Sequence, residues 1–554
     1  MAKLVTSVSA ARLTEVRTGI DQAGAAGAEW IELRLDHLAP CPAPSEVQEL
    51  LSSLRPGSWI VTLRSVDEGG KCPLPAGRRL AFLLEATAGC EGWIDFEYRA
   101  FQAGACEGSE VARPSDTLPC ETAHPVQIAT SPRPPATDSG MPLPSVAAAA
   151  GRRWILSVHD FQGRPEDVRV LARAIVSTGP ATMAKVAWEG HSARDNIVAF
   201  ELMRELGERV IAVVMGEVGL ASRVLAKKFG AAATYCALSS GTETAAGQLT
   251  LDEMLHRYRW DAISATTKWF GVLGAPVRHS MGPVLFNRLF DRAGLDAVYL
   301  PMLVAGGERE LVTFLEHCER CDWLDLGGFS VTLPHKQAAR RFVGPRVEPS
   351  AARIGAVNTL VMRDGRFHGC NTDCAGALDA LCDGLDCERS DLRGLCVDVL
   401  GAGGAARAVV AGLTDCGCDV TVYNRTADSA AALAAEFGCR PAAWPDRTRR
   451  SGRVVINCTS LGMTPHVEQS PLPAEALQDR PVVFDMVYHP VETRLLREAK
   501  QAGGLTIDGL EMFVRQAAAQ YQLWFGETPD ARVMREIVLR DLGGDGLGHR
   551  GAEA

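Results

Sequence analysis

Short apolar runs alternate with stretches of helical apolar spacing along the first 262 residues of the chain. Such runs, bounded by polar and glycine-containing segments, are typical of buried strands. Eight strands separated by helices over about 250 residues predict a (β/α)8 barrel. The expected strands are residues 4–8, 30–34, 59–62, 92–97, 154–158, 182–186, 210–214 and 232–235.

Residues 104–144 interrupt this alternation. The stretch is rich in Pro, Ala, Ser and Thr and poor in large apolar residues. Such a segment buries too little apolar surface to offset the entropy lost on ordering. We therefore expect a low-complexity insertion in a loop of the barrel, where added length is tolerated.

The alternation of strands and helices resumes after a connector at 257–268. An apolar strand followed by Gly401-Ala-Gly-Gly-Ala-Ala opens a third unit, and amphipathic helices over about 510–543 are expected to pack back onto the second. The fold class is α/β throughout. The predicted divisions are a barrel at 1–262, a second domain at 269–375 completed by about 515–543, a third at 376–514, and a tail at 544–554.

Composition and charge narrow the class of protein. Hydrophobic residues make up 47% of the 554 residues, and the formal net charge is −10. An acidic balance argues against nucleic-acid binding, and no apolar run approaches the roughly 20 residues of a membrane span. The N-terminus alternates and then turns polar, unlike a signal peptide. We expect a cytoplasmic protein without nucleic-acid or membrane partners, and the sequence favours no particular oligomeric state.

The 17 cysteines are scattered along the chain. Cys318/Cys321 and Cys416/Cys418 are close pairs, but neither is matched by a second pair at metal-ligand spacing with histidines. Reduced thiols in a cytosolic protein are the simpler interpretation, and no metal is expected.

Polar residues stand where the predicted barrel strands end, which is where barrels of this type place their active sites. Lys185 lies in an apolar strand, and partial desolvation favours its neutral amine, a nucleophile toward a ketone. Taken alone, Lys185 is better explained as a strand-end lysine that extends to solvent, and His159 as a structural histidine. Together the set suits an anionic substrate with a carbonyl group: Glu32, Arg34, Arg64, Glu68, His159, Lys185, Arg223 and Gln248.

Several motifs in the same order resemble type I 3-dehydroquinate dehydratase. They are Glu32-Leu-Arg-Leu-Asp, Thr62-Leu-Arg-Ser-Val-Asp-Glu-Gly-Gly, Ser157-Val-His-Asp-Phe, Met183-Ala-Lys-Val, Ala221-Ser-Arg-Val-Leu and Ala246-Gly-Gln. The resemblance implies that Lys185 forms an imine with the substrate ketone. It also implies that His159 acts as base and then as acid, and that Glu32 orients His159. Substrate-holding roles follow for Arg34, Arg64, Glu68, Arg223, Thr244 and Gln248.

The glycine-rich segment at 401–406 follows an apolar strand and precedes a helical run. Its backbone can approach a pyrophosphate at the N-terminus of a helix, so we expect a dinucleotide-binding Rossmann domain at 376–514. The next strand ends in Asn424-Arg425-Thr426, where NAD-specific folds usually place an acid. Arg425 can neutralise a 2′-phosphate and Thr426 can donate to it. The pattern favours NADP, with an ordinary surface arginine as the alternative.

Residues from about 270 to 543 resemble shikimate dehydrogenases. The motifs are Gly274-Ala-Pro-Val-Arg-His-Ser, Phe329-Ser-Val-Thr-Leu-Pro-His-Lys, Ile354-Gly-Ala-Val-Asn-Thr-Leu, Gly369-Cys-Asn-Thr-Asp-Cys-Ala-Gly, Asn457-Cys-Thr-Ser-Leu-Gly-Met and Asp485-Met-Val-Tyr-His-Pro. The resemblance implies reduction of 3-dehydroshikimate by NADPH, with Lys336, held by Asp373, stabilising the developing alkoxide.

The same resemblance assigns the remaining residues of this second site. Substrate contacts are expected from Ser280, Gly282, Thr332, Asn358, Tyr488 and Gln516. The cofactor site is expected to comprise Gly401, Ala402, Gly403, Gly404, Ala405, Asn424, Arg425, Thr426, Thr459, Met463, Gly509 and Met512.

One position departs from this family. Its members usually carry His-Ser-x-Ser-Pro, whereas the chain has His279-Ser-Met-Gly282-Pro. A lost hydrogen bond to a charged group costs about 1.5–3 kcal/mol unless water replaces it, and the glycine is expected to leave room beside the substrate. Relatives that accept quinate resemble this chain in having glycine there. Ser330, where bacterial relatives usually have Asn, resembles the fused enzymes of plants.

The leading hypothesis is a bifunctional enzyme that converts 3-dehydroquinate to 3-dehydroshikimate and then reduces this product to shikimate with NADPH. The fusion would raise the local concentration of the shared intermediate. One alternative, supported only by Gly282, is that the second domain acts on quinate. Another is a metabolite sensor built on these domains, against which the retained Lys185, His159, Lys336 and Asp373 argue.

Overall fold

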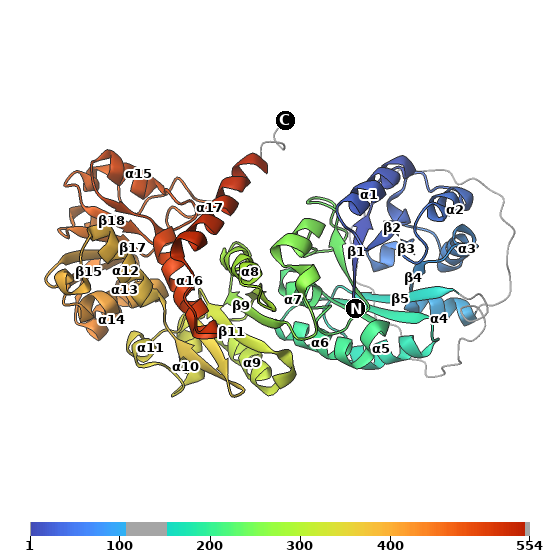
Figure 1. Ribbon diagram of the computed structural model, residues 1–554, viewed down its shortest axis with the longest axis horizontal. Helices are drawn as coiled ribbons and strands as arrows, with labels where there is room; N and C mark the ends of the chain where they lie inside the picture. The colour runs from blue at the N-terminus through green and yellow to red at the C-terminus, as the bar shows by residue number, and fades with distance from the viewer. Residues whose placement is uncertain (1, 107–151, 549–554) are drawn as a thin grey trace. The chain divides into compact units, whose positions relative to one another are not determined.

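The computed structural model describes residues 2–106 and 152–548, and its chain divides into two compact units (Figure 1). The first contains Met1–His256 and Trp260–Ala265, and the second contains Arg257–Arg259 and residues from Thr266 on. The predicted connector thus contributes to both units. Apart from residues 104–106, the predicted insertion at 104–144 lies outside the described residues, as does the tail beyond residue 548.

Eight parallel strands form the first unit, in the order β7-β6-β5-β4-β3-β2-β1-β8. The backbone N–H of Ala232, just before β8, donates to the Val210 carbonyl of β7 at 2.8 Å and joins the two ends of the sheet. The predicted barrel and its eight strands are confirmed. Their bounds are β1 (Lys3–Val8), β2 (Trp30–Arg34), β3 (Trp59–Thr62), β4 (Trp93–Glu97), β5 (Arg153–Asp160), β6 (Thr182–Glu189), β7 (Val210–Met215) and β8 (Ala233–Ala237).

Helices follow most of these strands, as Figure 1 shows for the first unit. The helices are α1 (Leu13–Ala25), α2 (Pro44–Ser52), α3 (Ala76–Ala86), α4 (Tyr98–Cys106), α5 (Val168–Ser177), α6 (Arg194–Leu206) and α7 (Leu220–Val224). Each barrel strand is therefore buried on both faces, by the helices outside and by the side chains of the barrel interior. In β6, seven of the eight residues are buried, as expected for a strand of a parallel barrel.

The interior of the barrel is apolar at one level and polar at the next. Val5, Ile60, Ile155 and Met183 belong to one buried cluster contributed by β1, β3, β5 and β6. Lys185 follows Met183 by two residues, so both side chains lie on the inner side of β6. The apolar layer thus supports a polar layer nearer the carboxyl ends of the strands.

The second unit begins with a five-stranded sheet in the order β10-β9-β11-β12-β13. Its first three strands are parallel, whereas β12 and β13 run antiparallel. The strands are β9 (Lys268–Gly274), β10 (Ala297–Leu303), β11 (Leu326–Val331), β12 (Thr359–Arg363) and β13 (Arg366–Cys370). The helices are α8 (Gly282–Arg292), α9 (Gly307–Arg320), α10 (Lys336–Val343) and α11 (Pro349–Ile354).

The last two helices, α16 (Gly509–Phe525) and α17 (Ala531–Gly548), pack onto this sheet as expected. Val514 and Tyr521 of α16 and Ile537 of α17 share a buried cluster with Phe270 of β9 and Phe286 of α8. Residues from α16 are thereby brought back to the carboxyl ends of β9 and β11.

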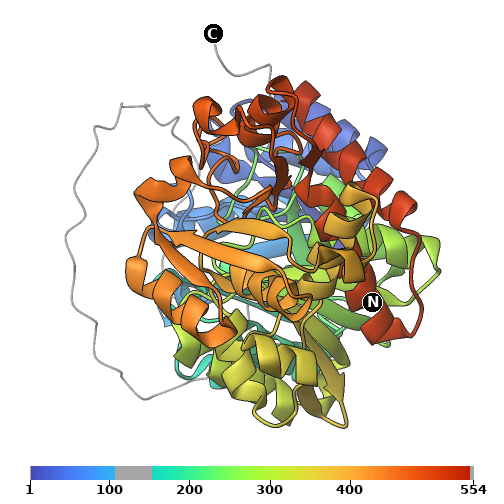
Figure 2. The same ribbon diagram turned by 90° about the vertical axis from the view of Figure 1, so that its left-hand side faces the viewer.

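A six-stranded parallel sheet in the order β16-β15-β14-β17-β18-β19 completes the second unit. This order, 3-2-1-4-5-6 in chain sequence, is that of dinucleotide-binding domains, and it confirms the predicted Rossmann fold. Figure 2 shows part of the sheet in orange. The strands are β14 (Cys396–Leu400), β15 (Asp419–Asn424), β16 (Arg440–Ala443), β17 (Val454–Asn457), β18 (Val482–Asp485) and β19 (Thr506–Ile507).

Helices cover both faces of this sheet: α12 (Asp373–Leu385), α13 (Gly404–Asp415), α14 (Ala427–Phe437) and α15 (Arg494–Gln501). Val454 and Ile456 of β17 belong to one buried cluster with residues of α12, α13 and α14. The intervening Val455 belongs to another cluster, with residues of α15. This alternation follows from the two-residue period of a strand. Among the described helices, none is both long enough and apolar enough to cross a membrane.

Candidate active sites

Lys185 lies in the polar layer of the barrel, where it meets acids that are distant in the sequence. Its Nζ donates to Asp95 Oδ2 of β4 at 2.8 Å and lies 3.8 Å from Glu32 Oε1. The ring of Tyr235 approaches from β8, with its centroid 4.0 Å from the same nitrogen. No acid is adjacent to Lys185 in its strand, and both acids beside its Nζ come from other strands of the barrel.

Asp95 was not among the predicted site residues, yet it connects three of the polar groups. It accepts hydrogen bonds from Lys185 Nζ, from Ser157 Oγ at 2.7 Å and from Arg64 Nη2 at 2.8 Å. Burial alone would raise the pKa of Asp95, but Arg64 and Lys185 outweigh it and hold the pKa far below the usual range. Asp95 is therefore an anion at neutral pH. The sequence feature that could have indicated Asp95 is an acidic residue inside a strand that is predicted to be buried.

Replacing Asp95 by Asn should lower the free energy of unfolding of the first unit by about 3–5 kcal/mol, because Arg64 and Lys185 lose a buried counter-charge. The measurement is chemical denaturation, followed by a probe in the barrel. Asp21→Asn on exposed α1 is the matched control, with an expected change within about 0.5 kcal/mol. Equal effects of the two substitutions would contradict this role for Asp95.

His159 and Glu68 form a pair at the end of β5. His159 Nδ1 lies 3.0 Å from Glu68 Oε2. Burial, together with the positive charges of Arg64 and Lys185, holds the pKa of His159 well below its ordinary value. Burial also raises the pKa of Glu68 to about 7. His159 is thus neutral at pH 7 and able to accept a proton.

The expectation that Glu32 orients His159 is wrong in this structure. Glu32 accepts hydrogen bonds from Ser7 Oγ at 2.7 Å and from Thr62 Oγ1 at 2.8 Å. It pairs in register with Ser7, inside the barrel wall. Glu68, in the turn that follows β3, reaches His159 instead, because this turn extends beyond the end of the strand.

The three predicted arginines differ in how far their charges are already neutralised. Arg34 makes two hydrogen bonds to Asp36, at 3.0 and 2.9 Å, and Arg64 is held by Asp95. Arg223 is 1% exposed, and it makes no ion pair with a carboxylate in the described part of the chain. Burial lowers its pKa to about 10. Arg223 is therefore the cation of this set that is most suited to an incoming anion.

A loop after β8 brings two further predicted residues to Arg223. Arg223 Nη2 donates to the Ala246 carbonyl at 3.2 Å. The backbone N–H and the Oγ1 of Thr244 both donate to Gln248 Oε1, at 2.8 and 3.2 Å. The structure thus groups Arg223, Thr244 and Gln248 around one segment of chain.

In the second unit, the predicted pair Lys336 and Asp373 is brought together at the starts of α10 and α12. Lys336 Nζ donates to Asp373 Oδ2 at 2.5 Å. Asn358 Nδ2 donates to Asp373 Oδ1 at 2.8 Å and to Thr372 Oγ1 at 2.9 Å. Thr372 Oγ1 in turn lies 3.5 Å from Gln516 Oε1 of α16. The carboxylate is held from one side so that its other oxygen faces the lysine.

The glycine loop lies beside this pair. Gly401 has φ +113°, in the range that favours glycine. A Cβ at Gly401 would lie 3.1 Å from the Cys458 carbonyl oxygen, and one at Gly404 would lie 3.2 Å from Lys336 Cδ. The loop therefore lies between β14 and β17, where the strand order reverses, and contacts the lysine stem. Ala402, Gly403 and Ala405 belong to the same segment.

Asn424, Arg425 and Thr426 follow at the same edge of the sheet, because β14 and β15 are parallel neighbours. Asn424 Nδ2 donates to the Thr426 carbonyl at 3.0 Å, and Thr426 occupies the position directly before α14. Arg425 is exposed and makes no ion pair with any residue that the structure describes.

Other predicted residues lie around the same region of the second unit. Ser280 Oγ accepts from the Gly282 N–H at 3.2 Å, and Tyr488 stacks on Phe513 of α16. Thr332 directly follows β11, and Thr459 Oγ1 donates to Asn457 Oδ1 at 2.7 Å after β17. Gly509 and Met512 lie in the first turn of α16, while Met463 is exposed.

The space beside Gly282 is not open, in contrast to the expectation from the missing serine. A Cβ at Gly282 would lie 3.0 Å from Tyr299 Cε1 and 3.3 Å from Tyr299 Oη. Tyr299 Oη donates to Ser330 Oγ at 2.7 Å, and Ser330 Oγ donates to Gln520 Oε1 at 2.7 Å. Neither Tyr299 nor Gln520 was predicted, because their contacts to this position are tertiary.

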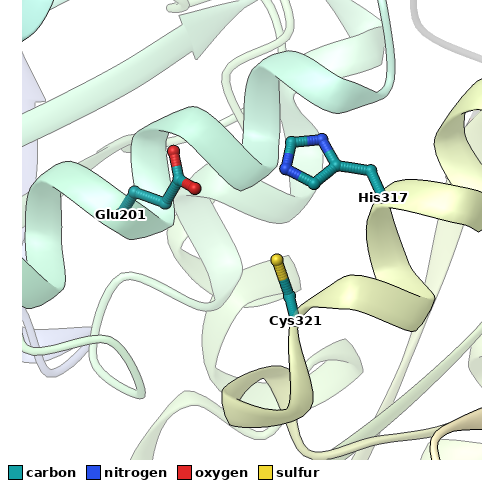
Figure 3. A group of neighbouring side chains, drawn as sticks. All are labelled: Glu201, His317 and Cys321. Atoms are coloured by element: carbon teal, nitrogen blue, oxygen red, sulfur yellow. The ribbon is translucent and has the colours of Figure 1, made fainter.

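Taken separately, neither unit brings together three histidine, cysteine or acidic ligand atoms among residues 2–106 and 152–548. Figure 3 shows His317 and Cys321 of the second unit, together with Glu201 from α6 of the first. The cysteines in the described part of the chain are free thiols, and none of them belongs to the polar groups above.

Family models match most of the chain. The model for type I 3-dehydroquinase matches residues 4–115 and 139–265. The shikimate dehydrogenase substrate binding domain matches residues 272–360, and the shikimate 5′-dehydrogenase C-terminal domain matches residues 509–539.

Curated relatives agree with these matches. A chloroplastic bifunctional 3-dehydroquinate dehydratase/shikimate dehydrogenase of Arabidopsis thaliana is 38% identical over 388 residues, covering 67% of this chain and 63% of the relative. A shikimate dehydrogenase (NADP(+)) of Bacillus cereus is 38% identical over 282 residues, covering 50% of this chain and 99% of the relative. One from Methanosarcina mazei is 39% identical over 285 residues, covering 49% and 98%. The match spans just under two thirds of the plant relative's length.

Proposed function

Because the chain belongs to the shikimate dehydrogenase family and carries a type I 3-dehydroquinase domain ahead of it, we propose that it catalyses two successive reactions. The first removes water from 3-dehydroquinate to give 3-dehydroshikimate. The second reduces 3-dehydroshikimate to shikimate with NADPH. The observation that carries the proposal is the presence, in one chain, of a buried lysine with a neutral histidine and of a second lysine paired with Asp373 beside a dinucleotide loop.

In the first reaction, the Lys185 amine attacks the substrate ketone and water leaves as the imine forms. The positively charged imine makes the neighbouring C–H acidic, and His159 removes that proton. The same histidine then protonates the hydroxyl that departs as water. Hydrolysis of the imine releases the product and restores the amine. Asp95 supplies a fixed negative charge beside the nitrogen throughout.

The substrate carboxylate has a natural partner in Arg223. Its buried guanidinium is not neutralised by a carboxylate of the described chain, and arginine can hold a carboxylate through two parallel hydrogen bonds. Thr244 and Gln248 would bind substrate hydroxyls, a role supported by their grouping with Arg223 in the loop after β8. Arg34 and Arg64 would attract the anionic substrate mainly through the positive electrostatic potential of their side chains, because their guanidinium groups are already hydrogen-bonded to Asp36 and Asp95.

The dehydratase rate should depend on the charge of the pair formed by Glu68 and His159. As the pH falls through about 7, Glu68 takes up a proton, because burial raises its pKa to about 7. The charge that stabilises the His159 cation is then lost, so kcat should fall on the acid side. In Glu68→Gln the acid limb should shift to lower pH, where His159 itself titrates. An unchanged profile in that variant, measured over pH 5 to 9, would remove Glu68 from the mechanism.

In the second reaction, the residues around the glycine loop fit a dinucleotide. Gly401 allows a close turn, and α13 begins at Gly404, so the N–H groups of its first turn can hold a pyrophosphate. Bound NADPH supplies hydride to the C3 ketone of 3-dehydroshikimate. Lys336, held by Asp373, stabilises the negative charge that develops on the oxygen and delivers the proton. Asn358 fixes the orientation of Asp373.

Arg425 is the residue that we expect to select NADP over NAD. Arg425→Ala should raise the KM for NADP by on the order of 10- to 100-fold, because a charge-assisted contact to the 2′-phosphate is lost. The KM for NAD should change little. The control is Arg449→Ala, an exposed arginine in the turn after β16. Steady-state oxidation of shikimate with each cofactor checks this prediction, and equal effects on the two cofactors would contradict it.

Quinate is the alternative substrate of the second site, since Gly282 lacks a serine hydroxyl. Tyr299 fills the space beside Gly282, which supports shikimate as the preferred substrate. The test is a comparison of NADP-linked oxidation of shikimate and quinate. A quinate rate well above the shikimate rate would overturn the assignment. The free thiols of the described chain fit a reducing compartment such as the cytoplasm, which we include in the proposal.

A further inference from the structure

Tyr235 brings an aromatic ring to the nitrogen on which the dehydratase reaction depends. It lies in β8, is 5% exposed, and places its ring centroid 4.0 Å from Lys185 Nζ. The two side chains come from strands separated by β7 around the barrel, so both project into the interior. The face of an aromatic ring carries negative potential and attracts a cation at this distance.

The Lys185 nitrogen loses hydrogens during the proposed reaction. It is nevertheless positively charged both as the ammonium and as the protonated imine. When the C–N bond forms and the C–O bond breaks, the departing water carries the ketone oxygen, one amine hydrogen and one added proton. The imine nitrogen keeps a single hydrogen and a positive charge. An ammonium can donate three hydrogen bonds, whereas the protonated imine can donate only one.

This change affects the two neighbours of the nitrogen differently. Asp95 Oδ2 accepts a hydrogen bond from Lys185 Nζ at 2.8 Å, and Glu32 Oε1 lies 3.8 Å away. With one N–H remaining, at most one of these carboxylates can be hydrogen-bonded directly. The attraction of the ring acts on the charge and needs no N–H, so it is retained when the imine forms.

We propose that Tyr235 is a catalytic residue of the dehydratase, and that the face of its ring stabilises the positively charged imine nitrogen at Lys185. This inference rests on the proposed dehydratase function and adds to it a residue that the sequence did not indicate. The ring would lower the energy of the imine when it forms and again when loss of the hydroxyl regenerates it.

The hydroxyl of Tyr235 is not the group that faces the nitrogen in this proposal. Tyr235 Oη is buried and has no hydrogen-bond partner among the described residues. Burial, with the negative charges of Glu32 and Asp95, raises the pKa of Tyr235 well above its ordinary value, so the phenol stays neutral. The proposed interaction therefore belongs to the ring face.

Variants at position 235 separate the effect of the ring's negative potential from the effect of its shape. In Tyr235→Phe the ring remains, in Tyr235→Leu it is lost, and phenylalanine analogues with increasing ring fluorination keep the shape while weakening the negative potential of the face. The readout is the initial rate at which borohydride traps the 3-dehydroquinate adduct on Lys185, located by mass spectrometry. Trapping in Tyr235→Phe should exceed that in Tyr235→Leu by about tenfold or more, and it should decline stepwise with fluorination.

A matched control is Phe200→Leu, which removes a buried ring that stacks on Phe229 outside the barrel interior. Its trapping rate should equal that of the wild type. Equal trapping across the fluorinated series, or equal trapping in the Phe and Leu variants at position 235, would overturn the inference. A wild-type protein that gives no adduct on Lys185 would instead overturn the proposed dehydratase itself.

Discussion

Replacing Lys185 by alanine should lower the turnover of 3-dehydroquinate by on the order of a thousandfold or more, because the proposed mechanism forms the imine on this amine. The NADP-linked oxidation of shikimate by the same variant should continue at the wild-type rate, since Lys336 lies in a separate unit. Formation of 3-dehydroshikimate, followed by the absorbance of its conjugated ketone, measures the first activity.

Two controls make this result specific. Lys3→Ala, which changes a half-exposed lysine at the start of β1, should leave dehydration unchanged. The variant at 185 also leaves Asp95 without one of its cations, so its thermal unfolding should be recorded with its rate. A dehydratase rate within a few-fold of the wild type in a folded Lys185→Ala protein would disprove the imine mechanism.

Replacing Lys336 by alanine should lower kcat for shikimate oxidation by about 10²- to 10⁴-fold. In the proposed mechanism the lysine stabilises charge on the reacting oxygen mainly in the transition state, so KM should change much less. Asp373→Asn should also lower kcat, because its Oδ2 accepts the Lys336 hydrogen bond at 2.5 Å.

The dehydratase rate of these variants is their internal control, because the barrel is a separate unit. Lys500→Ala, at an exposed position of α15, is the matched control within the second unit. If Lys336→Ala raised only the KM for shikimate, the lysine would bind substrate without taking part in proton transfer.

The architecture could be predicted from the sequence because it depends on local periodicity. Every barrel strand appeared as a short apolar run, and the glycine loop marked the start of the six-stranded sheet. The pair Lys336 and Asp373 followed from motif order, since each residue begins a helix after a strand of one sheet. Motif order also predicted His159 and Lys185 as site residues, but not which side chains they contact.

The partners depend on which side chains meet across the barrel, and sequence spacing does not contain that information. Asp95 reaches Lys185 from a strand two positions away, and His159 pairs with Glu68, although the family resemblance implied Glu32. Glu32 lies within a strand while Glu68 lies in a turn beyond one, a difference of depth that only the closed barrel defines. The filling of the space beside Gly282 by Tyr299 has the same tertiary origin.

The central claim is that one chain links dehydration at Lys185 to reduction at Lys336. It is tested most directly by supplying 3-dehydroquinate as the sole substrate with NADPH and identifying the product. The wild-type protein should consume NADPH and form shikimate, and Lys185→Ala should consume almost none. Continued NADPH loss in that variant, with quinate as the product, would contradict the account, as would a wild-type protein that leaves NADPH unchanged.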